Sequence, residues 1–206
     1  ERCPEQIRSG KRLAVIMGGY ARRVRDSVEK FLALETEKNA SLEGVYDKMK
    51  ELLVHDLTPE KFADMYAQTL VYGLFVGRYN DSSLQDFTRQ EAQANIPRSN
   101  PFLRHFFDHI AGIEFDQRLA YIVDELCAVF AVSDVHTLIQ KHLRLFEVEN
   151  DRDPLIHFYE DFLKEYDPAL RKSMGAYYTP TPVVRFIIRE VDRILKEDFG
   201  IADGIA

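Results

Sequence analysis

Apolar side chains recur at steps of three and four residues along almost the whole chain, which is the period of an amphipathic α-helix. The first apolar run lies within residues 13–32, and a second helix is expected over residues 41–54. Further apolar stripes lie within residues 119–130 and 155–163. No segment combines a period of two with enrichment in β-branched residues. The pattern therefore predicts an all-α fold, a bundle of about eight to ten helices. The first run consists of Leu13, Ile16, Met17, Tyr20, Val24, Val28, Phe31 and Leu32.

Four dipeptides mark helix starts, because each places a capping side chain before a proline. The helix that follows Thr58 carries apolar residues around nearly its whole circumference, which predicts a central position in the bundle. Gly18 and Gly19 interrupt the first predicted helix, where each costs about 1 kcal/mol relative to alanine. A closely packed neighbouring element would explain the two glycines.

The four dipeptides that mark helix starts are Thr58-Pro59, Asn100-Pro101, Asp153-Pro154 and Asp167-Pro168.

The charge balance is acidic, with 27 Lys and Arg against 34 Asp and Glu and a formal net charge of -7. A uniformly basic nucleic-acid-binding protein is therefore disfavoured. The first predicted helix nevertheless has a basic flank that contains Arg22, Arg23 and Arg25. These side chains are candidates for contact with DNA phosphates, and the alternative is an ordinary solvated helix face.

Cysteine content and the length of the apolar runs indicate the cell compartment and whether the chain crosses a membrane. Two cysteines, Cys3 and Cys127, do not make a disulfide framework, and no run reaches the roughly 18 apolar residues of a membrane span. We therefore expect a cytoplasmic protein without a membrane partner. The chain begins at Glu1 without an initiator methionine and ends at Ala206, so we expect it to be a fragment of a longer protein.

Residues that commonly carry chemistry are few. His105 and His109 are four residues apart and share a helix face, but no third metal ligand has an obvious place, so ordinary helix histidines are predicted. Cys127 lies on an apolar stripe and is predicted to be a buried, unreactive thiol. Gly-rich phosphate loops and the GxSxG nucleophile motif are absent. We expect no metal and no catalytic residue within this chain.

Residues 167–188 form the most informative segment, DPALRKSMGAYYTPTPVVRFII. Tyr177 and Tyr178 precede a helix that is capped by Thr179 or Thr181, with proline inside its first turn. Free N–H groups at such a helix start favour a carboxylate or phosphate, and the tyrosines offer a surface for a ring. The residues alone equally allow two core tyrosines before a well-capped helix. The stripe expected to be buried on this helix is Val183, Val184, Ile187, Ile188, Val191, Ile194, Leu195 and Phe199.

The run RKSMGAYYTPTPVVRFII resembles the motif that opens the catalytic domain of adenine-specific DNA methyltransferases. It is similar to type I modification subunits and to large single-chain restriction–modification enzymes. The helical region that precedes the methylase in the latter is also similar to the segments PEKFADMYAQTLVYGLFVGR, NPFLRHFFDHIAG and DPLIHFYEDFLKEYDP. The resemblance thus covers most of the chain.

The resemblance implies a cofactor, S-adenosylmethionine, and assigns the wall of its pocket to Tyr177, Tyr178, Thr179 and Pro180. It also implies DNA as the substrate, with methyl transfer to the exocyclic amine of adenine. The glycine-rich cofactor loop and the Asn/Asp-Pro-Pro-Tyr/Phe motif of the family are both absent. We therefore expect this chain alone to be inactive and not to bind the cofactor tightly.

These expectations define two regions, a helical coupler over residues 1–166 and the truncated start of an α/β methyltransferase domain over residues 167–206. The expected partners are the missing methyltransferase core, an N-terminal domain and DNA. The last helix is expected to pack back on the bundle or to pair with a second copy. Two alternatives stay open: a self-contained helical interaction module, and a DNA-contacting helical domain that uses Arg22, Arg23 and Arg25.

Overall fold

The computed structural model describes residues 7–34, 40–52, 55–81, 83, 86–97, 101–113, 115–144, 154–173, 179 and 181–205, and in these ranges it contains ten α-helices and no strand. The prediction of an all-α bundle is confirmed. The helices are α1 (Gly10–Ala33), α2 (Ala40–Leu52), α3 (Pro59–Asn80), α4 (Arg89–Asn95), α5 (Pro101–Ala111), α6 (Gln117–Ala131), α7 (Val135–Arg144), α8 (Pro154–Tyr166), α9 (Pro168–Ser173) and α10 (Thr181–Glu197).

Four helices of the structure begin at the prolines that the capping dipeptides predict as helix starts. The Thr58 hydroxyl accepts a hydrogen bond from the Lys61 N–H at 3.3 Å, and α3 begins at Pro59. The Asp167 carboxylate accepts from the Ala169 N–H at 2.9 Å at the start of α9. Helices α5 and α8 also begin at the proline of their pairs, although the capping residues of those two pairs lie outside the described ranges.

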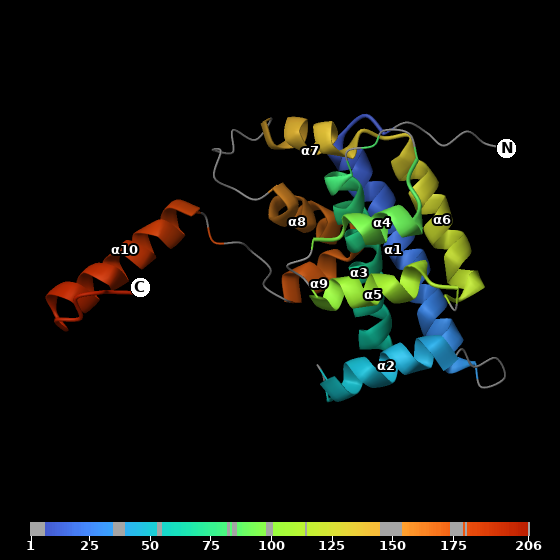
Figure 1. The fold of residues 1–206 in the computed structure, drawn as a ribbon, viewed down its shortest axis with the longest axis horizontal. Helices are drawn as coiled ribbons and strands as arrows, with labels where there is room; N and C mark the ends of the chain where they lie inside the picture. The colour runs from blue at the N-terminus through green and yellow to red at the C-terminus, as the bar shows by residue number, and fades with distance from the viewer. Residues whose placement is uncertain are drawn as a thin grey trace.

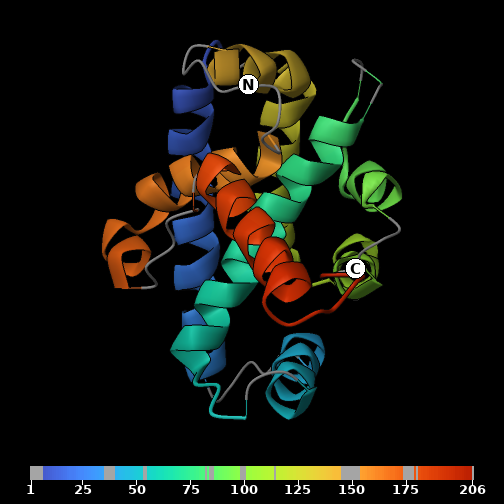
Figure 2. The same ribbon diagram turned by 90° about the vertical axis from the view of Figure 1, so that its left-hand side faces the viewer.

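Helix α3 runs through the middle of the bundle, as its apolar circumference predicts (Figures 1 and 2). Phe62, Tyr66, Leu70 and Leu74 are all completely buried. Helix α1 packs along α3 and also along α8, while α4, α6 and α7 pack against α3 from other directions. The core is therefore organised around the crossing of α1, α3 and α8.

The two glycines of α1 have different surroundings. A Cβ atom built on Gly18 would lie 2.9 Å from the carbonyl carbon of Glu165 and 3.0 Å from the Tyr166 nitrogen, both in the backbone of α8. A Cβ atom on Gly19 would meet nothing within 4 Å. The expected close neighbour thus exists for Gly18 and is absent for Gly19.

A buried arginine, which the apolar pattern does not reveal, holds the end of α3. Arg78 is 3% exposed and pairs with Asp81 at 2.7 Å. Its guanidinium also donates to the carbonyl oxygens of Ser83 at 2.9 Å and Ser133 at 3.3 Å. Breaking a buried pair from one side costs about 3–5 kcal/mol, so this arginine is a strong link between α3 and the end of α6.

Candidate functional site

Helix α8 is joined to α3 by a ladder of polar side chains beside the apolar core. The Tyr159 hydroxyl donates to the Gln68 side-chain oxygen at 2.8 Å, and the Gln68 amide donates to Asp64 Oδ2 at 2.8 Å. The Tyr166 hydroxyl donates to the other Asp64 oxygen at 2.5 Å. At the other end of α8, Tyr72 donates to a backbone carbonyl of α8. The ladder fixes the rotation and the height of α8 on the bundle.

The last turn of α8 is also held by α1. The Arg22 guanidinium donates to the carbonyl oxygens of Glu165 and Tyr166, the latter at 3.1 Å. Carbonyl groups at a helix end lack partners within the helix and carry partial negative charge, so a guanidinium satisfies both needs. Gly18 lies one turn before Arg22 on α1 and allows the two backbones to approach.

Tyr166 is the residue on which these contacts converge. Its ring stacks on Phe162 with 5.7 Å between centroids, and the Arg25 guanidinium lies 5.5 Å from the ring centroid. Burial and the hydrogen bond to the Asp64 carboxylate raise the pKa of the Tyr166 hydroxyl above its ordinary value. The hydroxyl therefore remains a hydrogen-bond donor at neutral pH.

The predicted cofactor-wall residues follow α9 in the chain. Tyr177, Tyr178 and Pro180 lie outside the described residues. Thr179 is exposed, two residues before the start of α10 at Thr181. The assignment of these four residues to a cofactor pocket stays a prediction.

Helix α10 projects from the bundle, apart from the other helices (Figure 1), and Figure 2 looks along the direction of this projection. Its predicted stripe is not buried, which corrects the sequence-based expectation that this helix packs back on the bundle. The physical reason is that no element of the described chain covers this face. Exposed fractions are 45% for Val183, 51% for Ile187 and Ile188, 43% for Val191 and 36% for Ile194.

The polar face of α10 is stabilised by pairs within the helix. Arg193 pairs with Glu190 at 3.1 Å and with Glu197 at 2.8 Å, and Lys196 pairs with Asp192 at 2.9 Å. These spacings of three and four residues support an exposed helix by a few tenths of a kcal/mol per pair. α10 thus has local stabilisation but an uncovered apolar face.

The chain after α10 turns back onto its polar face. Gly200 and Gly204 both adopt positive φ, a conformation that favours glycine. The Ile201 N–H donates to the Leu195 carbonyl at 2.9 Å, and the Ile205 N–H donates to Asp192 at 3.2 Å. Residues 199–205 therefore form a short tail whose contacts are with α10 itself.

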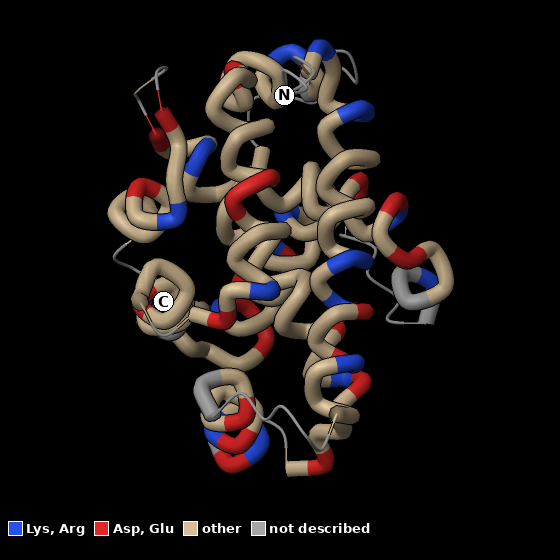
Figure 3. Tube along the Cα trace, turned by 90° about the vertical axis from the view of Figure 1, so that its right-hand side faces the viewer, with Lys and Arg blue, Asp and Glu red and all other residues tan. Residues whose placement is uncertain are grey.

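The three arginines proposed for DNA contact all have partners within the chain. Arg22 binds the end of α8, as described above. Arg23 pairs with Glu125 at 2.7 Å, and Arg25 pairs with Asp26 at 3.0 Å. On the face shown in Figure 3, Lys and Arg positions are interspersed with Asp and Glu positions. DNA contact by these residues stays a prediction, and the geometry gives each of them a structural role.

The remaining candidate residues are placed as ordinary structural groups. His105 and His109 lie on α5, where burial, helped by His105 and Lys48, lowers the pKa of His109. Cys127 is buried, as predicted, and burial raises the pKa of its thiol to about 12. Within the described residues, no group of three or more His, Cys, Asp and Glu side chains is arranged to hold a metal ion.

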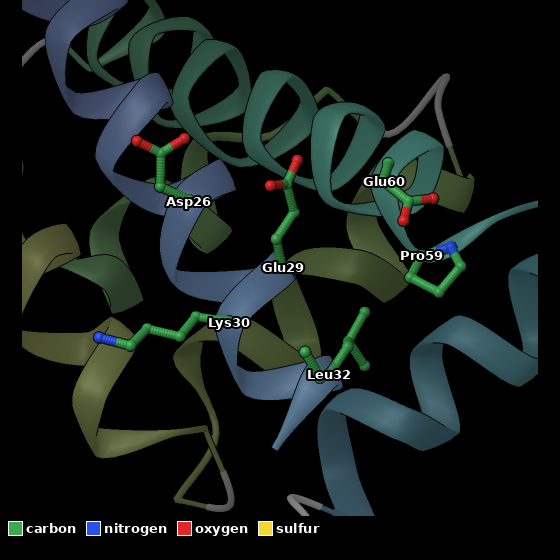
Figure 4. Close-up of a pocket in the computed structure, with 7 residues that line it drawn as sticks. Asp26, Glu29, Lys30, Leu32, Pro59 and Glu60 are labelled. Carbon is green, nitrogen blue, oxygen red and sulfur yellow. The ribbon is translucent and has the colours of Figure 1, made fainter. Parts of the chain in front are cut away.

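An open groove lies between the C-terminal end of α1 and the start of α3 (Figure 4). Asp26, Glu29 and Glu60 line it together with Lys30, and Leu32 contributes apolar surface. Asp26 already pairs with Arg25. The charged residues of the groove are mainly acidic, and its geometry assigns no ligand to it.

Sequence reasoning missed the polar ladder of α3 and α8. Asp64 and Gln68 are four residues apart and therefore share one face of an otherwise apolar helix. That spacing was the available signal, because a polar pair on a central helix needs partners from a neighbouring element. The partners themselves, Tyr159 and Tyr166, are 91 and 102 residues away in the chain from Gln68 and Asp64, and no local pattern connects them.

No helix of the described residues is long and apolar enough to cross a membrane. Residues 150–204 match the model of the N-6 DNA methylase family. No significant match was found among curated proteins or solved structures. The match includes α8, α9 and α10, so it begins within the bundle and continues along the projecting helix. It relates this C-terminal part of the chain to the DNA adenine methylases.

Proposed function

We propose that this chain is the helical coupler and the opening segment of an S-adenosylmethionine-dependent adenine DNA methyltransferase within a restriction–modification system. The observation that carries the proposal is the family match over residues 150–204. The bundle before it holds α8, and α10 leads toward the methylase core. In this arrangement the chain itself is a connector without catalytic activity.

The proposed cofactor wall is the segment Tyr177, Tyr178, Thr179 and Pro180. Thr179 is exposed close to the start of α10, a helix of 17 residues. Free N–H groups and the positive end of the helix dipole suit the carboxylate of the methionine part of the cofactor. S-adenosylmethionine supplies the methyl group, and the residues of this chain only bind and orient it.

The apolar face of α10 supports a place against the α/β core of the methylase. Its apolar positions span a stripe wider than the narrow seam of a two-stranded coiled coil. A broad stripe rich in Val and Ile suits the flat face of a sheet. An exposed apolar area of this kind marks an interaction surface. We propose the methylase core as its partner, and we propose that the methyltransferase domain starts near residue 167.

The proposal is tested by calorimetric titration of S-adenosylmethionine into this chain and into a gene product extended by roughly 200 residues, the size of one further domain. We expect binding by the extended protein only, lost in Tyr178→Ala and Thr179→Ala. Tyr121→Ala is the control, since Tyr121 is an exposed tyrosine of α6. A well-folded extended protein that does not bind the cofactor would contradict the proposal and favour a helical interaction module.

A further inference from the structure

We propose that the end of the bundle formed by the start of α1 and by α7 binds the phosphate backbone of double-stranded DNA. This surface, the cationic tip, consists of Arg8, Lys11 and Lys141. The proposal rests on the proposed function for the expectation that DNA is the partner. It adds a DNA contact outside the segment that matches the methylase family.

Two helices bring the cations of the tip together. A Cβ atom built on Gly10 would lie 2.6 Å from Cγ of His142, so the start of α1 touches α7 at this point. Lys11 and Lys141 are the chain neighbours of these two residues, Arg8 lies just before α1, and all three cations are exposed. Figure 1 shows α7 and the start of α1 at the same end of the bundle, and Figure 3 shows Lys and Arg positions at this end, beside the N label.

The two elements of the tip contain few acidic positions. The sequence from residue 7 to residue 25 contains no Asp or Glu, and neither does α7. Asp161 of α8 reaches the junction of the two helices, and its Oδ2 is engaged there at 2.8 Å from His142 Nε2. In a chain with a net charge of -7, this end is therefore a local cationic region that attracts a polyanion.

The first turn of α1 gives an independent indication of an anionic ligand. It contains Lys11 and Arg12 and no acidic residue. The N-terminal end of a helix carries partial positive charge, so acidic side chains are favourable there and cations are not. The folded chain thus holds two cations where its own backbone disfavours them. A phosphate bound at the tip offsets both the side-chain charges and the helix dipole.

The surroundings of the tip favour DNA over a membrane or an apolar protein surface. Among the described residues 7–31 and 133–142, no large hydrophobic side chain is exposed. Membrane-surface helices and the cores of protein interfaces need such apolar anchors. Within the described part of the chain, no ion pair is formed by the three tip cations, whereas Arg23 and Arg25 are paired. Cations without apolar neighbours suit phosphate contacts, which position a duplex without reading its sequence.

The experiment measures binding of a fluorescent DNA duplex to this chain by anisotropy over a series of salt concentrations. Each lost phosphate contact lowers the slope of log K against log salt by about 0.9. We therefore expect the slope to fall by up to roughly 2.7 in the triple variant, and two duplexes of unrelated sequence to bind equally well. A parent chain without salt-dependent binding at low ionic strength would overturn the proposal. The triple variant is Arg8→Gln, Lys11→Gln and Lys141→Gln.

A second triple variant is the matched control, because it removes the same charge from exposed lysines at the opposite end of the bundle (Figure 1). It should retain the slope of the parent chain. Equal losses in both triple variants would show an effect of net charge alone and would overturn the tip. Thermal unfolding should give similar transitions for all three proteins, since the replaced side chains are exposed. The control is Lys30→Gln, Lys48→Gln and Lys50→Gln.

Two further measurements separate the alternatives. Binding to vesicles of phosphatidylserine and phosphatidylcholine, but not to DNA, would overturn the proposal in favour of a membrane surface. Calorimetric titration of S-adenosylmethionine into the extended protein tests the proposed function separately. If the extended protein does not bind the cofactor while this chain binds DNA through the tip, the proposed function fails and the tip stands. If the cofactor binds while the tip variant retains the parent slope, the tip fails alone.

Discussion

Helices α8 and α10 both lie within the segment that matches the N-6 DNA methylases, yet they are stabilised in opposite ways. α8 buries Phe158, Phe162 and Leu163 completely and has polar partners on three other helices, α1, α3 and α7. α10 exposes its apolar stripe, and its Arg193 and Lys196 form ion pairs within the helix. Both helices have the same kind of amphipathic pattern. The pattern thus indicates that a face needs cover, and the polar groups around it determine which neighbour provides the cover.

Loss of a large apolar side chain should separate the two helices most clearly. Phe162→Ala removes a completely buried ring and is expected to lower the free energy of unfolding by about 3–5 kcal/mol. Ile187→Ala on α10 removes a side chain that is 51% exposed and should change it by less than about 0.5 kcal/mol. Urea denaturation followed by circular dichroism provides both values. A large loss in Ile187→Ala, dependent on protein concentration, would show that α10 pairs with a second copy.

Alanine in place of each of the two adjacent glycines of α1 should have the next largest effect on stability. The substitution should destabilise the chain at one position and stabilise it at the other. In Gly18→Ala the new methyl group meets the α8 backbone at 2.9–3.0 Å, and overpacking of this kind costs about 1–3 kcal/mol. Gly19→Ala adds a methyl group in open space within a helix and should stabilise the chain by about 0.5–1 kcal/mol. Thermal unfolding of the two variants measures the difference. Equal stabilities would contradict the close approach of α1 and α8.

The sequence was sufficient to predict the helices, but it predicted only some of the contacts between them. Periodicity and proline-preceding caps located the start of α3 at Pro59 and its central place, because these signals are local. Gly18 indicated a close neighbour without identifying it. The partner of Arg22 could not be predicted, since the pairing of α1 with the end of α8 spans more than 140 residues. The prediction that α10 packs back on the bundle was wrong, because amphipathicity indicates a face that needs cover but does not identify the covering element.

Removal of polar contacts should lower the free energy of unfolding by smaller amounts, which should still differ between α8 and α10. Tyr166→Phe removes the hydroxyl that donates to Asp64, and we expect a loss of about 1–1.5 kcal/mol. Arg193→Ala on α10 removes two exposed ion pairs, each contributing about 0.3–0.5 kcal/mol. Chemical denaturation at low and high salt is the measurement. The loss in Tyr166→Phe should be independent of salt, whereas salt should reduce the loss in Arg193→Ala. Equal sensitivity to salt would mean that the Tyr166 contact is solvated.

The smallest expected effect concerns the tail on α10 and follows from the pKa of Asp192. The hydrogen bond from Lys196, followed by that from the Ile205 N–H, lowers this pKa below its ordinary value of 3.8. A lowered carboxyl pKa in the folded state means that the contact is complete above 3.8 and is lost as the pH falls through the lowered value. In a nuclear magnetic resonance titration, the Ile205 amide should therefore report a midpoint below pH 3.8, and Asp192→Asn should abolish the transition.

This titration also sharpens the contrast between α8 and α10, because the tail contact is local to α10. Arg22→Ala disturbs the α8 end but leaves Asp192, Lys196 and Ile205 in place on their own helix. The Asp192 midpoint should therefore be the same in Arg22→Ala as in the parent chain. A shifted midpoint would mean that the end of α8 contributes to the folding of α10 itself. An unchanged midpoint would show that α10 and its tail form a self-supporting unit whose local structure does not depend on the end of α8.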